Sequence, residues 1–306
     1  MKQNIIILAA MAAMPLAFTA CSSSDDDNTT TYVITPATTE FADEAKKLNF
    51  GDGIPLPDMT VIESIELSES GRYLIRLTEP TLDYEVKTRA GANEDYEYLT
   101  GFYHILVKGE SYRLDGFGDL TMKIVGNVVN ITIKLLNGHE ATVEATPQDI
   151  VQAVAGSQGT RNLCQYWKVT KTRLRLENKK GLKLARDFEG CNLREIKQYI
   201  ESNSDCRINE TFETKGQITH ISFSNFKTFQ IDYTDGIDVG NWNWVKESDG
   251  TLHYTWEGHE MGNSFDAGNG VVVFKSNKSC WLTIDAVIDT DGTDYETTLT
   301  YMLEVE

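Results

Sequence analysis

The stretch Ser64-Ile65-Glu66-Leu67-Ser68-Glu69-Ser70-Gly71-Arg72-Tyr73-Leu74-Ile75 decides the fold class of this chain. Ile65 and Leu67 alternate with polar residues, and the same alternation returns after the Ser70-Gly71 turn. Successive side chains of a strand point to opposite faces, so this pattern predicts an antiparallel hairpin with one buried face.

The pattern recurs in the second half of the chain. Ile65, Leu67, Ser68, Tyr73 and Ile75 correspond to Ile221, Phe223, Ser224, Phe229 and Ile231, each 156 positions further on. The stretch Gly101–Ile105 corresponds to Gly240–Trp244, and Ile131–Ile133 to Leu282–Ile284. A predicted helix precedes the hairpin in each half, through Phe41, Ala45 and Leu48 in the first and through Leu193, Ile196 and Ile200 in the second. Elements that recur in the same order indicate a tandem repeat.

The remaining pattern is mostly that of strands. Short alternating segments with turns such as Asn137-Gly138 between them are typical of a meander that closes into a barrel or sandwich. A long strand is expected at residues 165–176, and Asn192 is placed to cap the second helix. Thr146-Pro147 is typical of the start of another short helix.

The sequence therefore predicts a mostly β protein of two tandem antiparallel barrel units with short accessory helices. The units are expected at residues 32–146 and 160–306, joined by a helical linker at residues 147–159.

The first residues predict where in the cell the protein is located. Residues 1–20 have the apolar run and small residues of a secretory signal, and Cys21 follows directly. This arrangement resembles the lipobox of bacterial lipoproteins, although Phe18 stands where that family usually has Leu. The resemblance implies that Cys21 becomes the N-terminus and carries a diacylglycerol anchor with palmitate-type acyl chains. Residues 21–31 are expected to form a disordered acidic tether, and they resemble the sorting tag of surface-exposed Bacteroidetes-type outer-membrane lipoproteins.

A further resemblance covers residues 163–306, which look like the lipocalin-like (calycin-type) domains of such lipoproteins. The matching motifs are Tyr166–Lys168, Cys206 ahead of Phe212, Gly240–Trp244 and Cys280–Leu282. The first half matches only through the repeat. The resemblance implies an eight-stranded barrel or half-open barrel with one end able to hold a ligand.

Charge limits the partners of the chain. Its formal net charge is −18 at pH 7, and nucleic-acid binding depends on Lys and Arg that contact phosphates. We therefore expect no nucleic-acid partner. The expected partners are the outer membrane, through the anchor, and either a small glycan or lipid ligand or an outer-membrane protein.

Four cysteines remain once Cys21 is assigned to the anchor. An even number outside the cytoplasm favours two disulfides, and Cys206–Cys280 with Cys164–Cys191 is the preferred pairing. The alternative is four buried free thiols that pack as small hydrophobic groups.

The strongest candidate for ligand binding is a set of aromatic residues, Trp242, Trp244, Tyr254 and Trp256. Flat rings on neighbouring strands could stack on a sugar or lipid, or they could simply fill the barrel core. Two weaker candidates have plainer explanations. The acidic segment Asp289–Asp294 fits a hairpin turn better than a calcium loop. The basic segment Lys168–Arg186 could bind an anionic ligand, but a solvated strand face with charges that deter edge pairing explains it better.

No motif of a hydrolase, metalloprotease or nucleotide-binding site occurs. The sequence therefore predicts a non-catalytic protein without metal or cofactor. It either binds a small apolar or glycan ligand or acts as a structural subunit of an outer-membrane complex, and a hydrolase is the third alternative.

Overall fold

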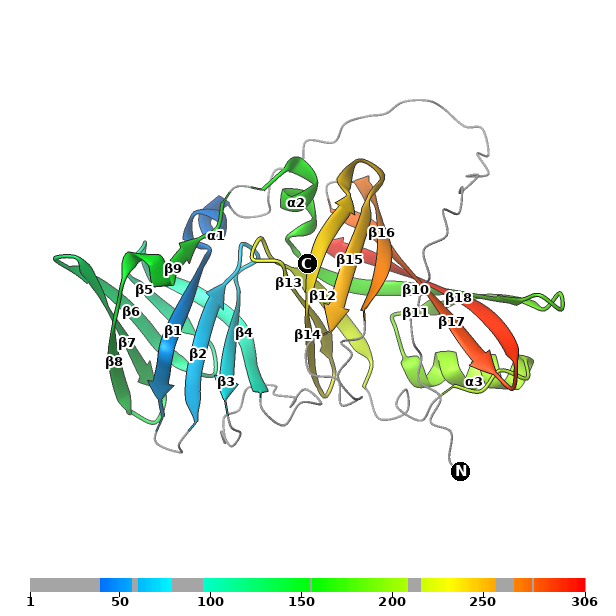
Figure 1. The fold of residues 1–306 in the computed structure, drawn as a ribbon, viewed down its shortest axis with the longest axis horizontal. Coiled ribbons are helices and arrows are strands. Elements are labelled where there is room, and N and C mark those ends of the chain that lie inside the picture. The colour runs from blue at the N-terminus through cyan, green and yellow to red at the C-terminus, as the bar shows by residue number, and fades with distance from the viewer. Residues whose placement is uncertain are drawn as a thin grey trace.

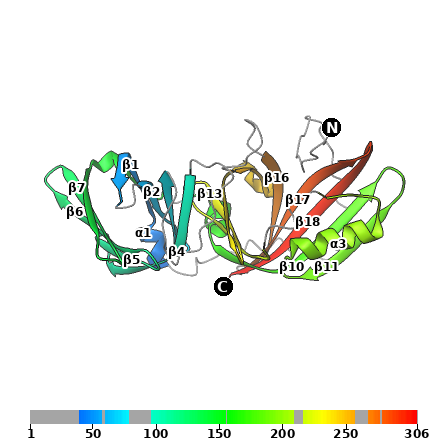
Figure 2. The same ribbon diagram turned by 90° about the horizontal axis from the view of Figure 1, so that it is seen from below.

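The computed structural model describes residues 39–56, 60–78, 96–154, 156–208, 216–256, 267–276 and 278–305. They form two barrel-like antiparallel sheets that lie side by side, with few short helices (Figures 1 and 2). The predicted mostly β architecture is confirmed. The predicted signal, Cys21 and the tether lie outside the described residues.

The first unit is a nine-stranded sheet in the order β8-β7-β6-β5-β4-β3-β2-β1-β9. The short strand β9 follows β8 through the 3-10 helix η1 and pairs with β1, so it closes the meander on itself. The elements of this unit are α1 (Thr39–Glu44), β1 (Lys46–Pro55), β2 (Val61–Leu67), β3 (Arg72–Thr78), β4 (Tyr96–Val107), β5 (Ser111–Leu114), β6 (Gly118–Val125), β7 (Val128–Leu135), β8 (Glu140–Ala145), η1 (Pro147–Asp149) and β9 (Ile150–Gln152).

The second unit closes more completely. Its sheet has the order β11-β10-β12-β13-β14-β15-β16-β17-β18, and β10 also pairs with β18. The long β10, β17 and β18 extend beyond the barrel, where α3 packs its apolar side against them (Figure 2). The elements are α2 (Gln158–Leu163), β10 (Tyr166–Asn178), β11 (Lys183–Glu189), α3 (Leu193–Asn203), β12 (Ile218–Phe223), β13 (Thr228–Tyr233), β14 (Gly236–Lys246), η2 (Glu247–Asp249), β15 (Thr251–Trp256), β16 (Ala267–Ser276), β17 (Ser279–Thr290) and β18 (Thr293–Val305).

The predicted repeat is present in the structure. In the first unit Ile65 pairs with Ile75, and in the second Ile221 pairs with Ile231. All four side chains are buried. Each hairpin also has a register shift at the same place in its first strand. The alternation seen in the sequence therefore specifies the same core hairpin twice.

One buried hydrogen bond recurs in both units. The hydroxyl of Tyr103 donates to the backbone carbonyl of Ser68 over 3.0 Å. In the second unit, Nε1 of Trp242 donates to the carbonyl of Ser224 over 3.1 Å. Both aromatic side chains are almost wholly buried, so the equivalent strand fills each barrel with a ring whose polar end satisfies a turn carbonyl.

The helix predicted through Phe41, Ala45 and Leu48 is wrong beyond its first turn. The helix α1 ends at Glu44, and β1 follows, with Lys46, Leu48 and Phe50 buried at a period of two. Hydrogen bonding to β2 outweighs the helical spacing of three apolar residues.

The pairing of helices between the halves also needs correction. α1 and α2 each directly precede the first strand of a unit, so α2, and not α3, is the equivalent of α1. Within the predicted helical linker, residues 147–149 form a 3-10 helix and Ile150–Gln152 is the strand β9 of the first sheet. The predicted helix at Leu193 is confirmed, and the Asn192 side chain accepts from the Glu195 amide.

Candidate functional site at the seam between the units

The two units meet along a seam that contains buried charge. Nη2 of Arg72 donates to Oδ2 of Asp232 over 2.9 Å, and the hydroxyl of Tyr166 donates to the same oxygen over 2.9 Å. The side chains of Arg72 and Asp232 are only 7% and 9% exposed. The guanidinium also lies 4.8 Å from the ring centres of Tyr166 and Phe102. Charges removed from water need such partners, so the pair holds the two units in one register.

A second buried carboxylate crosses the seam nearby. Glu66 of β2 accepts hydrogen bonds from the hydroxyls of Ser224 (2.6 Å) and Thr228 (2.8 Å) of the second unit. Burial raises the pKa of the Glu66 carboxyl, although these hydroxyls and Lys47 partly oppose the rise. The seam is therefore a polar interface with few water-accessible groups.

Equivalent strands of the two units face each other across the seam. Leu74 of β3 and Tyr98 of β4 form one apolar cluster with Ile237 and Val239 of β14. β4 and β14 occupy the same place in the repeat, as the pairs Tyr73–Gly101 and Phe229–Gly240 show. The seam thus joins like surfaces, as the interface of a symmetric dimer does.

An aromatic pocket of about 330 Å³ opens at one end of this seam. The first unit contributes most of its wall, and the second contributes the start of β10 and the end of β18. The lining residues are Phe41, Glu69, Ser70, Gly71, Phe102, Tyr103, His104, Asp115, Gln165, Tyr166 and Val305. The volume falls within the range of small-molecule sites, and the wall combines rings with a few polar groups as such sites do.

Edge-to-face contacts between aromatic rings hold the wall of the aromatic pocket in place. Phe41 and Tyr103 meet edge to face with ring centres 5.0 Å apart, and Phe102 and Tyr166 do so at 5.4 Å. Phe102 is 42% exposed, so its ring remains available to a ligand. Sequence reasoning did not predict this site, because the rings come from distant strands and each alone looks like ordinary core or surface.

Glu69 lies between this pocket and a second one of about 320 Å³. The second pocket, called here the amide pocket, is lined by Ala42, Asp43, Ala45, Glu69, Gln152, Ala153, Arg161, Cys164, Gln165 and Asn225. Oε2 of Glu69 accepts from the backbone amide of Asn225 over 3.3 Å, whereas no described residue donates to the buried Oε1. Burial raises the pKa of the Glu69 carboxyl, hydrogen bonds from its own amide and from Asn225 partly oppose the rise, and the charge of Glu66 adds to it.

Unsatisfied polar atoms gather at the seam. Among the described residues, six buried side-chain atoms lack a partner, and three of them are Glu69 Oε1, Arg72 Nε and Asp232 Oδ1. Buried polar groups are normally paired, so such a group calls for an explanation. This concentration distinguishes the seam from the rest of the described chain.

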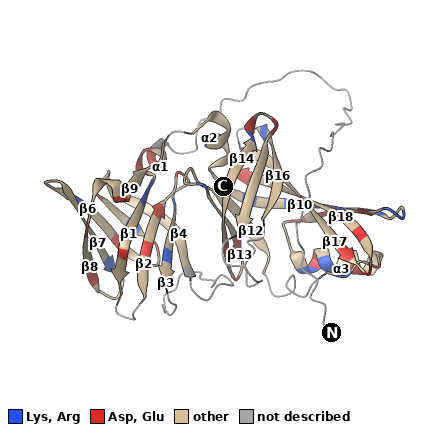
Figure 3. Cartoon of the chain, in the orientation of Figure 1, with Lys and Arg blue, Asp and Glu red and all other residues tan. Residues whose placement is uncertain are grey.

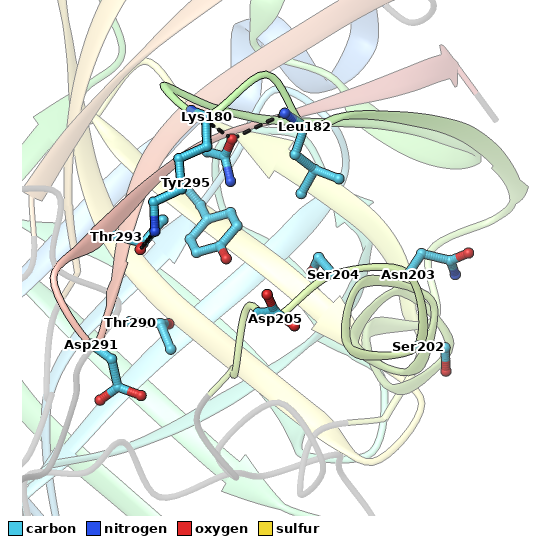
Figure 4. A pocket seen from close by; sticks show the side chains of 11 residues that line it. Lys180, Leu182, Ser202, Asn203, Ser204, Asp205, Thr290, Asp291, Thr293 and Tyr295 are labelled. Carbon is cyan, nitrogen blue, oxygen red and sulfur yellow. Dashed lines mark hydrogen bonds between the residues drawn. The ribbon is translucent and has the colours of Figure 1, made fainter.

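A third pocket, of about 740 Å³ and larger than the other two, lies far from the seam. The tips of the β10–β11 and β17–β18 hairpins and the end of α3 surround it (Figure 4). Oδ1 of Asn178 accepts from the amides of Lys180 and Leu182, and Nζ of Lys180 donates to Thr293. These polar groups hold the hairpin tips, and none of the unpartnered buried atoms in the described chain lies here. We therefore place the candidate site at the seam.

Of the predicted aromatic set, Trp242, Trp244 and Tyr254 do not line any of these three pockets. Trp242 is 0% exposed, and Nε1 of the half-buried Trp244 donates to Thr160 of α2 over 3.0 Å. Tyr254 packs against the core beside Phe229, with ring centres 6.0 Å apart. The side chain of Trp256 lies outside the described residues. Trp242, Trp244 and Tyr254 thus serve as barrel core, the alternative that the sequence left open.

The structure keeps both predicted cysteine pairs apart, and all four are buried free thiols. Cys164 precedes β10, whereas Cys191 lies beside Thr172, about 20 Å further along that strand. Disulfides need Cα atoms within about 7 Å.

The second pair is separated in the same way. Cys206 bonds to Thr290 at the end of β17, and Cys280 lies near the start of that strand, about 33 Å away. Short-range position in the sequence was therefore a poor guide to cysteine pairing. Burial also raises the pKa of each of the four thiols, which keeps them protonated.

The basic segment is matched by acidic neighbours. Arg173 pairs with Asp187 across β10 and β11 over 2.7 Å, and Lys171 pairs with Glu189 over 3.0 Å. Figure 3 shows basic and acidic residues interspersed along the chain. Asp291 has a positive φ of 50° in the turn between β17 and β18, as the predicted hairpin requires. Within the described ranges, no group of three His, Cys, Asp or Glu residues is arranged to hold a metal ion.

Comparison with known proteins gives no family. No protein-family model matches the chain, and no curated protein matches it. None of the helices in the described part of the chain is both long and apolar enough to cross a membrane.

Proposed function

We propose that this chain is a lipid-anchored protein of the bacterial outer membrane, of the lipocalin-like type, which binds a small glycan or apolar ligand without chemical conversion. The aromatic pocket at the seam is the binding site. One observation carries the proposal: a hollow of about 330 Å³ where exposed and half-buried rings meet a carboxylate with an unpartnered oxygen.

The chemistry of the wall suits a sugar. Hydroxyl groups of a sugar can donate to the side-chain oxygens of Glu69, Asp115 and Gln165, while its CH faces pack on Phe102 and Tyr166. A small apolar ligand would use the rings alone. The site lies between two units, which is a common place for ligand pockets.

The anchor rests on the N-terminal sequence. Cys21 follows the small residues of the signal, and the acidic tether would place the two units outside the membrane surface. Replacing Cys21 by Ser tests it: the variant should leave the membrane fraction while the wild type stays there. Equal retention of both would refute the anchor.

A second candidate function is a structural subunit of an outer-membrane complex. The barrel cores are filled by large side chains, and several apolar residues near strand ends of the first unit are at least half exposed, among them Leu106, Val107, Ile124 and Val125. Exposed apolar groups near one another often mark a protein interface. Co-purification of a specific membrane protein that is lost on polar substitution of these residues would favour this function.

Ligand-detected NMR tests the binding function. The full-length protein is screened with methyl glucoside, N-acetylglucosamine, glucosamine and lauric acid. Binding of at least one probe should fall at least about tenfold in Phe102→Ala, because the ring supplies contact area. Ile124→Ala removes an exposed apolar residue elsewhere and is the matched control. No binding by any probe, or equal loss in both variants, would contradict the proposal.

A further inference from the structure

The charged groups of the aromatic pocket have one sign. Glu69 and Asp115 line it, and no Lys or Arg is among its described lining residues. Arg72, which lies against the rings of Phe102 and Tyr166, is already paired with Asp232. Oδ2 of Asp115 lies 2.9 Å from Nε2 of the exposed His104.

Glu69 has capacity for a cation. Hydrogen bonds from its own amide and from the amide and side chain of Asn225 act on the carboxylate, but its Oε1 has no hydrogen-bond partner among the described residues and no cation stabilises its charge. A buried carboxylate that has no cationic partner lowers the stability of the fold. A positively charged ligand that reaches Glu69 would supply the missing ion pair and would be bound more tightly for that reason.

Two further features favour a cation. Phe41, Phe102, Tyr103 and Tyr166 surround the same space, and the faces of such rings attract ammonium groups. The chain as a whole has a net charge of −18, which raises the concentration of small cations near its surface.

From this juxtaposition we infer that the aromatic pocket selects small ligands that carry a protonated amine, such as a glycan with a free amino sugar, and that Glu69 is the residue that recognises the amine. The inference rests on the proposed binding function and narrows it to one ligand class. Neutral sugars of the same ring shape should bind more weakly.

Titration calorimetry with three probes tests the inference. Glucosamine carries the ammonium, whereas N-acetylglucosamine and methyl glucoside have the same ring without the charge. We expect glucosamine to bind the wild-type protein at least about tenfold more tightly than either neutral sugar, since hydrogen bonds to charged groups are the stronger ones. High salt should reduce only the binding of glucosamine.

Two variants assign the selectivity. Glu69→Gln keeps the size of the side chain and should reduce glucosamine affinity about tenfold while leaving the neutral sugars unchanged. Glu110→Gln changes an exposed carboxylate elsewhere in the first unit and should leave all three affinities unchanged. Melting temperatures check that the variants fold, and the comparison of the three probes on wild-type protein needs no variant.

The outcomes separate the two proposals. If all three sugars bind equally and Phe102→Ala weakens the binding of all three, the aromatic pocket is supported as the binding site and the selectivity for amines is refuted. If glucosamine binds best but Glu69→Gln and Glu110→Gln behave alike, the role of Glu69 is refuted. If no sugar binds, the inference fails, and the binding function then depends on the lauric acid result.

Discussion

Removing the buried ion pair at the seam should destabilise both units together. In Arg72→Met, Asp232 keeps only the hydroxyl of Tyr166 as a donor to its Oδ2, and its side chain is 9% exposed. Breaking a buried pair from one side typically costs about 3–5 kcal/mol. Because Tyr166 remains, we expect a loss near the lower limit, about 3 kcal/mol.

The five tryptophans allow the unfolding of the second unit to be followed separately from that of the whole protein. All of them lie in the second half of the chain, whereas strands of both units contribute to circular dichroism. Urea unfolding is followed by both signals. Arg72 belongs to the first unit, so a shift of the tryptophan transition in Arg72→Met reports coupling across the seam. Asp232→Asn and the double variant complete a cycle, whose coupling energy should be about 2 kcal/mol.

The matched control is another Arg–Asp pair in the first unit. Arg113 contacts Asp119, but their side chains are 47% and 32% exposed, so Arg113→Met should cost at most about 1 kcal/mol. If Arg72→Met costs no more than this control, the pair is not desolvated and the reasoning is wrong. If only the circular dichroism signal shifts, the seam does not couple the units.

Three further predictions concern buried groups of the seam and of the first barrel. The folded-state pKa of Glu66 is raised, so the stability contributed by its protonated form is present below its ordinary pKa and lost as pH rises through the raised value; melting curves between pH 4 and 8 should show a larger loss in wild-type protein than in Glu66→Gln, in which the raised pKa of Glu69 remains, and parallel curves would contradict it. Gly101→Ala should cost about 1–3 kcal/mol, because its Cβ would lie 2.7 Å from the ring of Tyr73; Gly51→Ala, with nothing within 4 Å, should be within about 0.5 kcal/mol of wild type in urea unfolding, and similar losses would refute the contact. Tyr103→Phe removes one of two donors to the buried carbonyl of Ser68, which keeps the amide of Gly71, and should cost about 0.5–1.5 kcal/mol by urea unfolding, whereas an unchanged midpoint would mean that water replaces the bond.

Local alternation determined much of this fold from the sequence alone. The hairpins around Ile65 and Ile221, their repetition, and the helix capped by Asn192 all depend on neighbours within a few residues, where side-chain period and capping chemistry act directly. The prediction that Trp242 could fill a barrel came from the same alternation.

Tertiary structure decided what depends on distant partners. The segment from Lys46 to Phe50 became a strand because β2 and β9 offered hydrogen bonds on its two edges. The cysteines lie too far apart to pair because long strands separate them. The candidate site follows the same rule: Arg72 and Asp232 are 160 positions apart, and the pocket beside them exists only where two complete units meet. No local pattern can encode such a contact, because each half of it looks like ordinary surface until the other half is folded against it.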